Sequence, residues 1–206
     1  MIYMTEVAQE KAGYIRFFNG AVGVEAADIF VNGELVVENL EHGAFSPYKK
    51  AKPGAYSIEV RIAQGNSDVM YSELISLMED MAYTMAMAGD AGHLDMAIIS
   101  LDLRMDAARP NVRFANLVPY DTVMDIEIDK QTAVRGLMYK EASEHVEIKK
   151  DNLKFSVTVI NSDDEVILED GLSVKPDGSY IVMIAGSMSV PESVPQLYMA
   201  EDLPML

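Results

Sequence analysis

Residues 15–19, Ile-Arg-Phe-Phe-Asn, and residues 27–33, Ala-Asp-Ile-Phe-Val-Asn-Gly, decide the fold because the chain contains this pair of segments twice. The second pair is Val-Arg-Phe-Ala-Asn at 112–116 and Met-Asp-Ile-Glu-Ile-Asp-Lys at 124–130. Both segments recur 97 residues further along the chain. Self-similarity at a fixed spacing is the signature of a repeated structural unit. The sequence therefore predicts two copies of one domain.

The match between the copies extends well beyond these segments. Few residues are identical, but apolar positions keep their parity, and a slip by one residue would turn every strand inside out. We therefore predict one domain over residues 1–106, with its core at 14–103, and a second over residues 107–206, with its core at 111–202. A short joint at 107–110 predicts that the two domains touch or are held in a limited range of angles. Matched apolar pairs include Val37 with Val134, Leu40 with Leu137, Val60 with Val157, and Val69 with Val166.

Short alternating segments separated by turn residues predict an all-β protein. Asn32-Gly33 is a hairpin signal, and residues 56–62 alternate between apolar and polar side chains. No long helical pattern interrupts this series, so each copy is expected to be a β-sandwich. In the first copy we expect strands at 14–19, 27–32, 56–62, 69–77, 83–88 and 96–102, a return strand at 36–37, and an irregular strand at 43–49. The last strand of the second copy is expected near 197–201.

Composition excludes several classes of chemistry. The chain has 206 residues, no cysteine and a formal net charge of −17. Without cysteine there are no disulfides, thiolate nucleophiles or cysteine metal sites. Both copies are acidic, at −9 and −8, so a nucleic-acid backbone or an anionic membrane would be repelled. No apolar run approaches the roughly 20 residues needed to cross a bilayer. We therefore expect no nucleic-acid partner and no membrane insertion.

The repeated residues resemble the bacterial domain-of-unknown-function family numbered 4397, which is often found as tandem copies. The first copy carries the pattern on Arg16, Asn19 and the segment 28–33, and the second on Arg113, Asn116 and the segment 125–129. Pro-Gly-Ala-Tyr at 53–56 resembles the turn of that family, and 83–89 resembles its late tyrosine strand. The His-Ala-x-Pro-Asp segment of the family is absent, and Lys130 stands where its glycine belongs. The resemblance implies immunoglobulin-like sandwiches, frequently on exported proteins, with no established activity.

Residue types that often carry chemistry do not form recognised motifs here. Met78, Met81, Met85 and Met87 are closely spaced, but Val182 and Ile184 replace the last two in the second copy, which favours core packing over metal binding. The histidines lack the spacing of a zinc site or a catalytic dyad. His42 and Tyr48 correspond to Tyr139 and His145, the same two positions with residues exchanged, which suggests two half-exposed sites for a flat polar ring. We expect no catalytic residue, no cofactor and no metal.

Two charged pairs recur at identical spacing. Arg16 with Asp28, and Arg113 with Asp125, combine an arginine on one strand with an aspartate on the next. Because a guanidinium can bind a carboxylate through two parallel hydrogen bonds, these residues are predicted to form structural pairs. A ligand site using both residues is the alternative.

An acidic turn at 161–165, Asn-Ser-Asp-Asp-Glu, carries oxygen ligands that would suit calcium. Its spacing fits no EF-hand, and the corresponding turn at 64–68 is far less charged. A solvated hairpin tip is the preferred interpretation, and calcium binding by Asp163 to Glu165 stays open.

Basic residues are scarce but gather at one place in each copy. One cluster is Lys49, Lys50 and Lys52, and the other is Lys149, Lys150 and Lys154. Both lie at the turn that enters the strand of Ile58 or Phe155, so they are expected to project from the same end of each sandwich. Solvated lysines at a turn are common. The sharper hypothesis is that they contact an acidic surface of the neighbouring domain or of another molecule.

These observations together predict a non-enzymatic binding or structural module, with a protein partner, self-association or a place at the cell surface as its setting. Such a module should show an apolar patch or a free strand edge. One alternative is an enzyme with an acidic site at the domain junction, which should show a polar cleft with convergent carboxylates. The other is a calcium-stabilised surface protein. The start of the chain lacks a signal-peptide pattern. We expect cytoplasmic localisation if Met1 is the native start, and an extracellular or surface location if a leader was removed.

Overall fold

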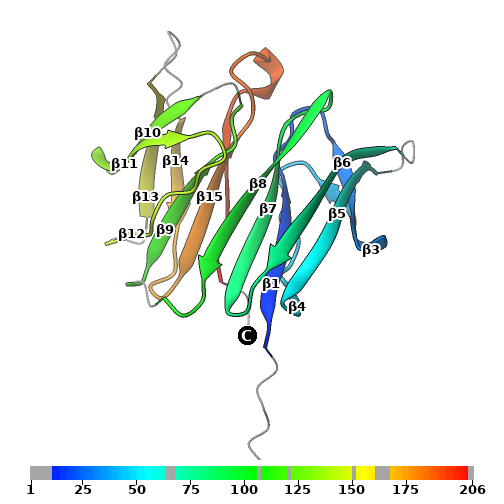
Figure 1. The fold of residues 1–206 in the computed structure, drawn as a ribbon. Helices are drawn as coiled ribbons and strands as arrows, with labels where there is room; N and C mark the ends of the chain where they lie inside the picture. The colour runs from blue at the N-terminus through cyan, green and yellow to red at the C-terminus, as the bar shows by residue number, and fades with distance from the viewer. Residues whose placement is uncertain are drawn as a thin grey trace, which may run out of the picture.

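The computed structural model describes residues 11–63, 68–105, 108–119, 122–149, 152–160 and 168–203. In these ranges the strands form four sheets of four strands each, which pair into two β-sandwiches (Figure 1). Domain 1 denotes the sandwich of the first eight strands, and domain 2 that of the next eight. The predicted fold, two tandem β-sandwich domains in an all-β chain, is confirmed.

The strands of domain 1 are β1 (Gly13–Asn19), β2 (Ala26–Val31), β3 (Glu34–Glu41), β4 (Lys49–Ala51), β5 (Gly54–Ile62), β6 (Val69–Leu77), β7 (Met81–Asp90) and β8 (His93–Asp102). Those of domain 2 are β9 (Asn111–Asn116), β10 (Val123–Ile128), β11 (Gln131–Met138), β12 (Val146–Glu147), β13 (Asn152–Val159), β14 (Leu168–Ser173), β15 (Ser179–Ala185) and β16 (Gln196–Glu201). A 3₁₀ turn, η1 (Pro191–Ser193), precedes β16.

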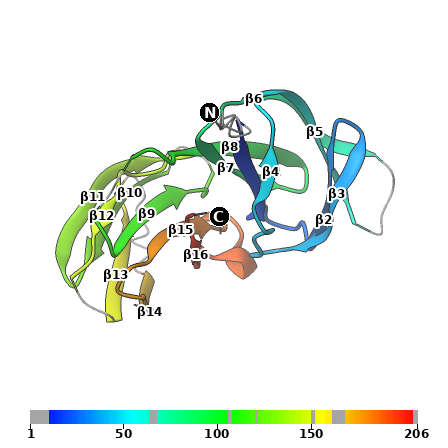
Figure 2. The ribbon, with the colours of Figure 1, turned by 90° about the horizontal axis from the view of Figure 1, so that it is seen from below.

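Each domain has the same topology. In domain 1 the outer sheet has the order β3-β2-β5-β6 and the inner sheet β4-β1-β7-β8; domain 2 repeats this with β11-β10-β13-β14 and β12-β9-β15-β16. The first strand of each copy runs parallel to its seventh, and the other paired strands are antiparallel. Viewed from below, the two inner sheets lie between the two outer sheets, so the molecule has four layers (Figure 2).

The spacing of 97 residues holds from β1 to β15 and changes at the last strand. Tyr83 pairs with Ser100 in domain 1, and the matching Tyr180 pairs with Glu201 in domain 2. Ser100 and Glu201 are therefore equivalent although they are 101 residues apart. The longer connection that contains η1 supplies the additional residues.

The asparagine of the repeated motif ties the first strand to the turns beside it. The side chain of Asn19 donates to the carbonyl oxygens of Val24 and Leu40, at 3.0 and 3.1 Å. Asn116 makes similar bonds to the carbonyls of Thr122 and of Leu137, the equivalent of Leu40, both at 3.1 Å. Both side chains are fully buried, and a buried amide is stable only with such partners. This explains why the motif recurs.

Alternation along β1 places one face in the core of domain 1 and the other toward domain 2. Ile15 and Phe17 pack in that core, whereas Phe18 belongs to a separate apolar cluster shared with domain 2. β7 follows the same rule, with Met85 and Met87 fully buried in the core as expected. Strands buried on both faces read as continuous apolar runs, and β7 and β15 have this character.

The irregular strand expected at 43–49 is wrong. Gly43 and its neighbours form a turn, Phe45 makes only an isolated bridge to Phe18, and the strand begins at Lys49. The acidic turn at 161–165 lies outside the described residues. No helix of the described ranges has the length and apolar character to span a bilayer.

We predict that residues 1–106 and 107–206, produced separately, each unfold cooperatively with a β-rich spectrum. The reason is that each sandwich has its own buried cluster, one around Phe17 and Ile58, the other around Phe114 and Phe155. The faces that meet in the whole chain become exposed in the halves, so the halves should bind each other when mixed. Circular dichroism melts and sedimentation velocity test this. Two unfolded halves would mean that both copies share one core.

Candidate functional site

The inner sheets of the two domains pack face to face through small and large apolar side chains. Phe18 of β1 has its ring centroid 4.4 Å from that of Phe45 and 5.5 Å from that of Tyr198 in domain 2. The matching positions in the other copy carry alanines, Ala115 for Phe18 and Ala142 for Phe45. The two copies therefore contribute side chains of different size at these equivalent positions. The fully buried members of this interface are Phe18, Ala86, Ala88, Ala97, Ile99, Ala115, Leu117, Ile181, Met183 and Ala185.

A buried carboxylate joins the two repeated arginines at the edge of this interface. Asp202, which has no exposed surface, accepts a hydrogen bond from Nε of Arg113 to Oδ2 at 2.7 Å. Its Oδ1 lies 3.5 Å from Nη2 of Arg16. Arg16 and Arg113 are only 3% and 6% exposed. Three charges are therefore removed from water together, which is stable only when each has partners.

The remaining bonds of the arginines follow a pseudo-two-fold pattern. Arg16 of domain 1 donates from Nη1 to the carbonyl oxygen of Glu201 in domain 2, at 2.6 Å. Arg113 of domain 2 donates from Nη1 to the carbonyl oxygen of Ser100 in domain 1, at 2.9 Å. Because Ser100 and Glu201 are equivalent, the two contacts are copies of one interaction related by the pseudo-two-fold axis. Asp202 breaks the symmetry, since its equivalent in domain 1 is Leu101.

The predicted pairs Arg16–Asp28 and Arg113–Asp125 are not the ones that the structure forms. Asp28 instead accepts the backbone N–H of Asn39 at 2.8 Å, and Asp125 accepts that of Gly136, also at 2.8 Å. Both aspartates fix the left-handed residues of the β2–β3 and β10–β11 hairpins, with φ of 53° and 65°. The arginines point from the opposite sheet toward the other domain. Sequence spacing identified four structural residues but assigned the wrong partners.

Arg16 is also covered by aromatic rings. Its guanidinium carbon lies 4.3 Å from the centroid of Tyr48 and 4.9 Å from that of Phe45, and its Nε donates to Thr84 at 2.9 Å. Burial lowers the pKa of Arg16 and raises the pKa of Tyr48. The cation is therefore held by stacking, hydrogen bonds and one shared carboxylate, with little access to solvent.

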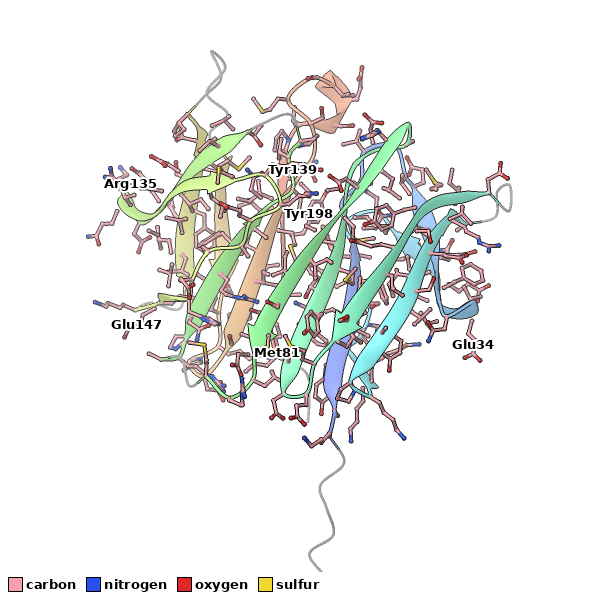
Figure 3. The ribbon with its side chains drawn as sticks, viewed as in Figure 1. Glu34, Met81, Arg135, Tyr139, Glu147 and Tyr198 are labelled. Carbon is pink, nitrogen blue, oxygen red and sulfur yellow. The ribbon has the colours of Figure 1, made fainter. Side chains whose placement is uncertain are left out.

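The four exchanged ring positions all lie around the interface. Tyr48 covers Arg16, and His145, at the equivalent position, is half-buried near Arg113. His42 Nε2 is 3.3 Å from the hydroxyl of Tyr198, and Tyr139 donates to Asp95 at 3.3 Å. Figure 3 shows Tyr139 and Tyr198 between the two sandwiches. These rings lie at the periphery of the interface between the domains.

Hollows flank the interface but do not gather catalytic groups. A hollow of about 220 Å³ is lined by Glu25, His42, Glu192 and Tyr198, and one of about 350 Å³ by Asp102, Arg113, Glu144 and His145. In the second, Asp102 is bound by Arg104 at 2.7 Å, and Arg113 is bound to Asp202. Across the described ranges, no three His, Asp or Glu side chains come together as metal ligands. Absence of a metal site or catalytic group stays a prediction.

A second feature, the inter-sheet opening, occurs once in each domain at equivalent residues. In domain 1 it lies between edge strands β4 and β3, has a volume of about 290 Å³ and is lined by Ile15, Phe17, Val31, Val36, Ala51, Tyr56, Leu77 and three lysines. In domain 2 it lies between β12 and β11, has a volume of about 390 Å³ and includes Ile128, Ala133, Val146, Ile148 and Leu153. Each opening reaches toward the core of its sandwich.

The rims of the two openings differ in charge. Lys49, Lys50 and Lys52 line the opening of domain 1. The equivalent residues in domain 2 are Val146, Glu147 and Lys149, joined there by Asp129. Lys49 donates from Nζ to the carbonyl oxygen of Val36, so its side chain crosses from β4 to β3 at the mouth. The rim of domain 1 is cationic in a chain whose net charge is −17.

Only one lysine of the second predicted cluster lines the opening of domain 2 among the described residues. Lys149 lines the opening of domain 2. Lys154 lies on β13 with an exposed side chain, and its backbone N–H lies 3.4 Å from Asp129 Oδ1. Lys150 lies outside the described residues. Contact between any of these lysines and a partner stays a prediction.

The model of the family described as "Domain of unknown function (DUF4397)" matches residues 13–109 and 110–204. The chain belongs to this family. Its two DUF4397 domains coincide with the two sandwiches, and the expected resemblance is confirmed. No curated protein is similar enough to the chain to count as a match. One similar solved structure, titled "Alpha-glucan binding by a streptococcal virulence factor", is 8% identical, with 83% of this chain and 92% of that chain covered and a TM-score of 0.29.

We predict that replacing Asp202 by alanine lowers the free energy of unfolding by about 3–5 kcal/mol, because it leaves two buried arginines without their carboxylate. Denaturant unfolding measures the change. Glu201→Ala is the matched control, because Arg16 binds the backbone carbonyl of Glu201, while the Glu201 side chain pairs with Lys175 at the surface. This change should lower the free energy of unfolding by less than about 1 kcal/mol. Equal effects of the two changes would contradict the role assigned to Asp202.

A pH dependence follows from His145. Burial, and next the positive charge of Arg113, lower the pKa of His145 below its ordinary value of 6.5, with Asp202 and Glu144 opposing and Arg109 adding to the effect. The unfolded chain therefore binds a proton at a higher pH than the folded one, and this contribution to stability is lost as pH falls below 6.5. Tyr48 occupies the equivalent position in domain 1, so His145→Tyr is a natural replacement.

We expect the melting temperature of the wild type to fall more steeply than that of His145→Tyr between pH 7.5 and about 5.5. Scanning calorimetry at several pH values measures both slopes under the same buffers. Since carboxylates titrate in both proteins, the difference between the slopes isolates the histidine. Parallel curves would show that the charge of His145 does not couple to folding.

Proposed function

We propose that the chain is a non-enzymatic binding module, and that its binding surface is the inter-sheet opening of domain 1. The partner that fits this opening carries an apolar group next to a negative charge. The observation that supports this most directly is the contrast between two equivalent openings, one rimmed by three lysines and the other by Glu147, Asp129 and a single lysine.

Duplication provides an internal comparison for this argument. If the lysines served only solubility, they would be as useful in domain 2 as in domain 1. Instead Lys49 and Lys50 are replaced by Val146 and Glu147, while the lining residues Val31, Ala51 and Tyr56 correspond to Ile128, Ile148 and Leu153. Charge therefore varies at the mouth while the apolar cavity persists. A difference of this kind supports a ligand preference in domain 1.

The interface between the domains supports the same assignment by elimination among the charged groups. Arg16, Arg113 and Asp202 are bound to one another, and Asp95 is bound by Lys140 at 3.0 Å. Burial opposes ionisation of Asp95, but the hydrogen bonds from Lys140, the backbone of Met96 and Tyr139, together with the charge of Lys140, lower its pKa. These groups hold the domains together rather than presenting charge to a ligand. The lysines of the domain 1 opening are exposed.

We expect the dye anilinonaphthalene sulfonate, an aromatic ring system with one sulfonate, to bind the native protein at one site and to fluoresce there. The triple variant Lys49→Glu, Lys50→Glu, Lys52→Glu should bind the dye at least tenfold more weakly, because the rim then repels the sulfonate. High salt should weaken binding to the wild type, since the Debye length is about 3 Å at 1 M. Fluorescence titration measures all three quantities.

The matched control is Lys130→Glu, Lys149→Glu, Lys154→Glu, which changes the net charge by the same amount in domain 2. It should bind the dye nearly as well as the wild type. Thermal melts of all three proteins check that they remain folded, because dyes of this class also bind partly unfolded chains. Equal loss in both variants would show that net charge alone, and not the opening of domain 1, attracts the dye.

A further inference from the structure

We infer that the natural ligand of the domain 1 opening is a linear fatty carboxylate, with its alkyl chain between the two sheets and its carboxylate at the lysines. This inference rests on the proposed function and specifies its ligand. It is carried by the apolar cavity wall, the three lysines at the rim and the limited strand edge that the mouth offers for pairing.

The wall of the opening offers carbon surface and almost no free polar group. Its floor is formed by Ile15, Phe17 and Leu77, all at most 6% exposed, with Val31 and Val36 on the side. The one polar side chain of the wall, Tyr56, already donates its hydroxyl to the carbonyl of Lys52 at 2.8 Å. Because a buried polar group needs a partner, the part of a ligand that enters must be apolar.

The size of the cavity suits a slender chain. At about 290 Å³ it is at the lower end of the range for ligand pockets, roughly 300–1,000 Å³. It opens between the edge strands of two packed sheets, where an alkyl chain can lie against the apolar side chains that line it. Burial of each methylene is favourable, so affinity should grow with chain length until the cavity is full.

The rim supplies the opposite charge for a carboxylate. Lys50 and Lys52 are exposed on β4 and the turn after it, and Lys49 lies across the mouth with its ammonium on the carbonyl of Val36. A carboxylate placed there would bring Lys49 a charged partner, and charge-assisted hydrogen bonds are roughly twice as strong as neutral ones. Lys49 can thus bind the carboxylate head group while the alkyl chain of the ligand lies in the opening.

An acidic peptide is the competing occupant, and the strand edge disfavours it. A peptide that adds a strand needs a row of free backbone groups. β4 has only three residues, and on the eight-residue edge strand β3 the carbonyl oxygen of Val36 already accepts a hydrogen bond from Lys49. An alkyl carboxylate needs no such row. Domain 2 should bind neither well, because Glu147 and Asp129 repel anions at its opening.

The experiment is calorimetric titration of the full chain with hexanoate, octanoate, decanoate and dodecanoate, each below its aggregation concentration. We expect one site per chain and an affinity that rises about fourfold for each added methylene, followed by a plateau. Decanol should bind more weakly than decanoate, and decyltrimethylammonium should not bind. The triple glutamate variant at Lys49, Lys50 and Lys52 should lose decanoate binding, and the domain 2 control variant should keep it.

A gain of function makes the test sharper. Val146→Lys with Glu147→Lys places the two missing lysines beside Lys149 at the domain 2 opening and should raise the stoichiometry of decanoate from one toward two. Ala51→Phe, which keeps every lysine but fills the cavity, should abolish the dependence on chain length. Thermal melts without ligand confirm that each variant is folded.

The outcomes separate the two proposals. Dye binding that is lost in the triple variant, together with carboxylate affinity that does not depend on chain length, overturns the fatty carboxylate and leaves the binding module intact. Displacement of the dye by an acidic peptide but not by decanoate also overturns it and assigns a protein segment instead. If neither dye nor carboxylate binds at this opening, both proposals fail.

Discussion

The arrangement of the whole molecule depends on one shared carboxylate. Asp202 follows the last strand and meets Arg113 and Arg16 where the two inner sheets come together. Two buried guanidinium groups in one place would repel each other, and a fully buried aspartate would be costly alone. Together they satisfy each other only when both sandwiches are folded and docked. Burial of this triad therefore ties the end of the chain to both domains and selects a single docking geometry.

The interface is formed by equivalent surfaces of the two domains, whose side chains differ between the copies. The bonds from Arg16 to Glu201 and from Arg113 to Ser100 keep the symmetry of a pair of like domains, as in an isologous dimer. Around this frame, Phe18 packs near Tyr198 of domain 2, while its equivalent is Ala115. A symmetric pair would place two phenylalanines or two alanines at these positions, leading to a clash or a cavity. Divergence of the copies favours the pair within one chain over a pair of identical domains.

The sequence predicts the sandwich and its tandem arrangement because side-chain parity is a local property that survives divergence. It does not predict the partners of Arg16, since spacing along the chain says nothing about which sheet faces which. One signal was present: residues 82–88 of β7 are apolar or small without alternation, which is typical of a strand buried on both faces. That pattern would have placed Arg16, on the neighbouring strand, in an interface. Asp202 follows β16, whose offset differs from that of the other strands, so comparison of the copies missed it.

The lysine clusters could be recognised in the sequence, but the opening that they line could not. Lysines stand out in an acidic chain, whereas an opening between sheets depends on how far β4 and β3 are separated, a tertiary property. In both domains the fourth strand is short, three residues in β4 and two in β12, so the edge beside it leaves the core accessible. A short edge strand protects a sheet from unwanted pairing. Here it also exposes apolar carbon at the mouth, and three lysines beside that carbon give the opening of domain 1 the combined apolar and cationic character on which the proposed binding rests.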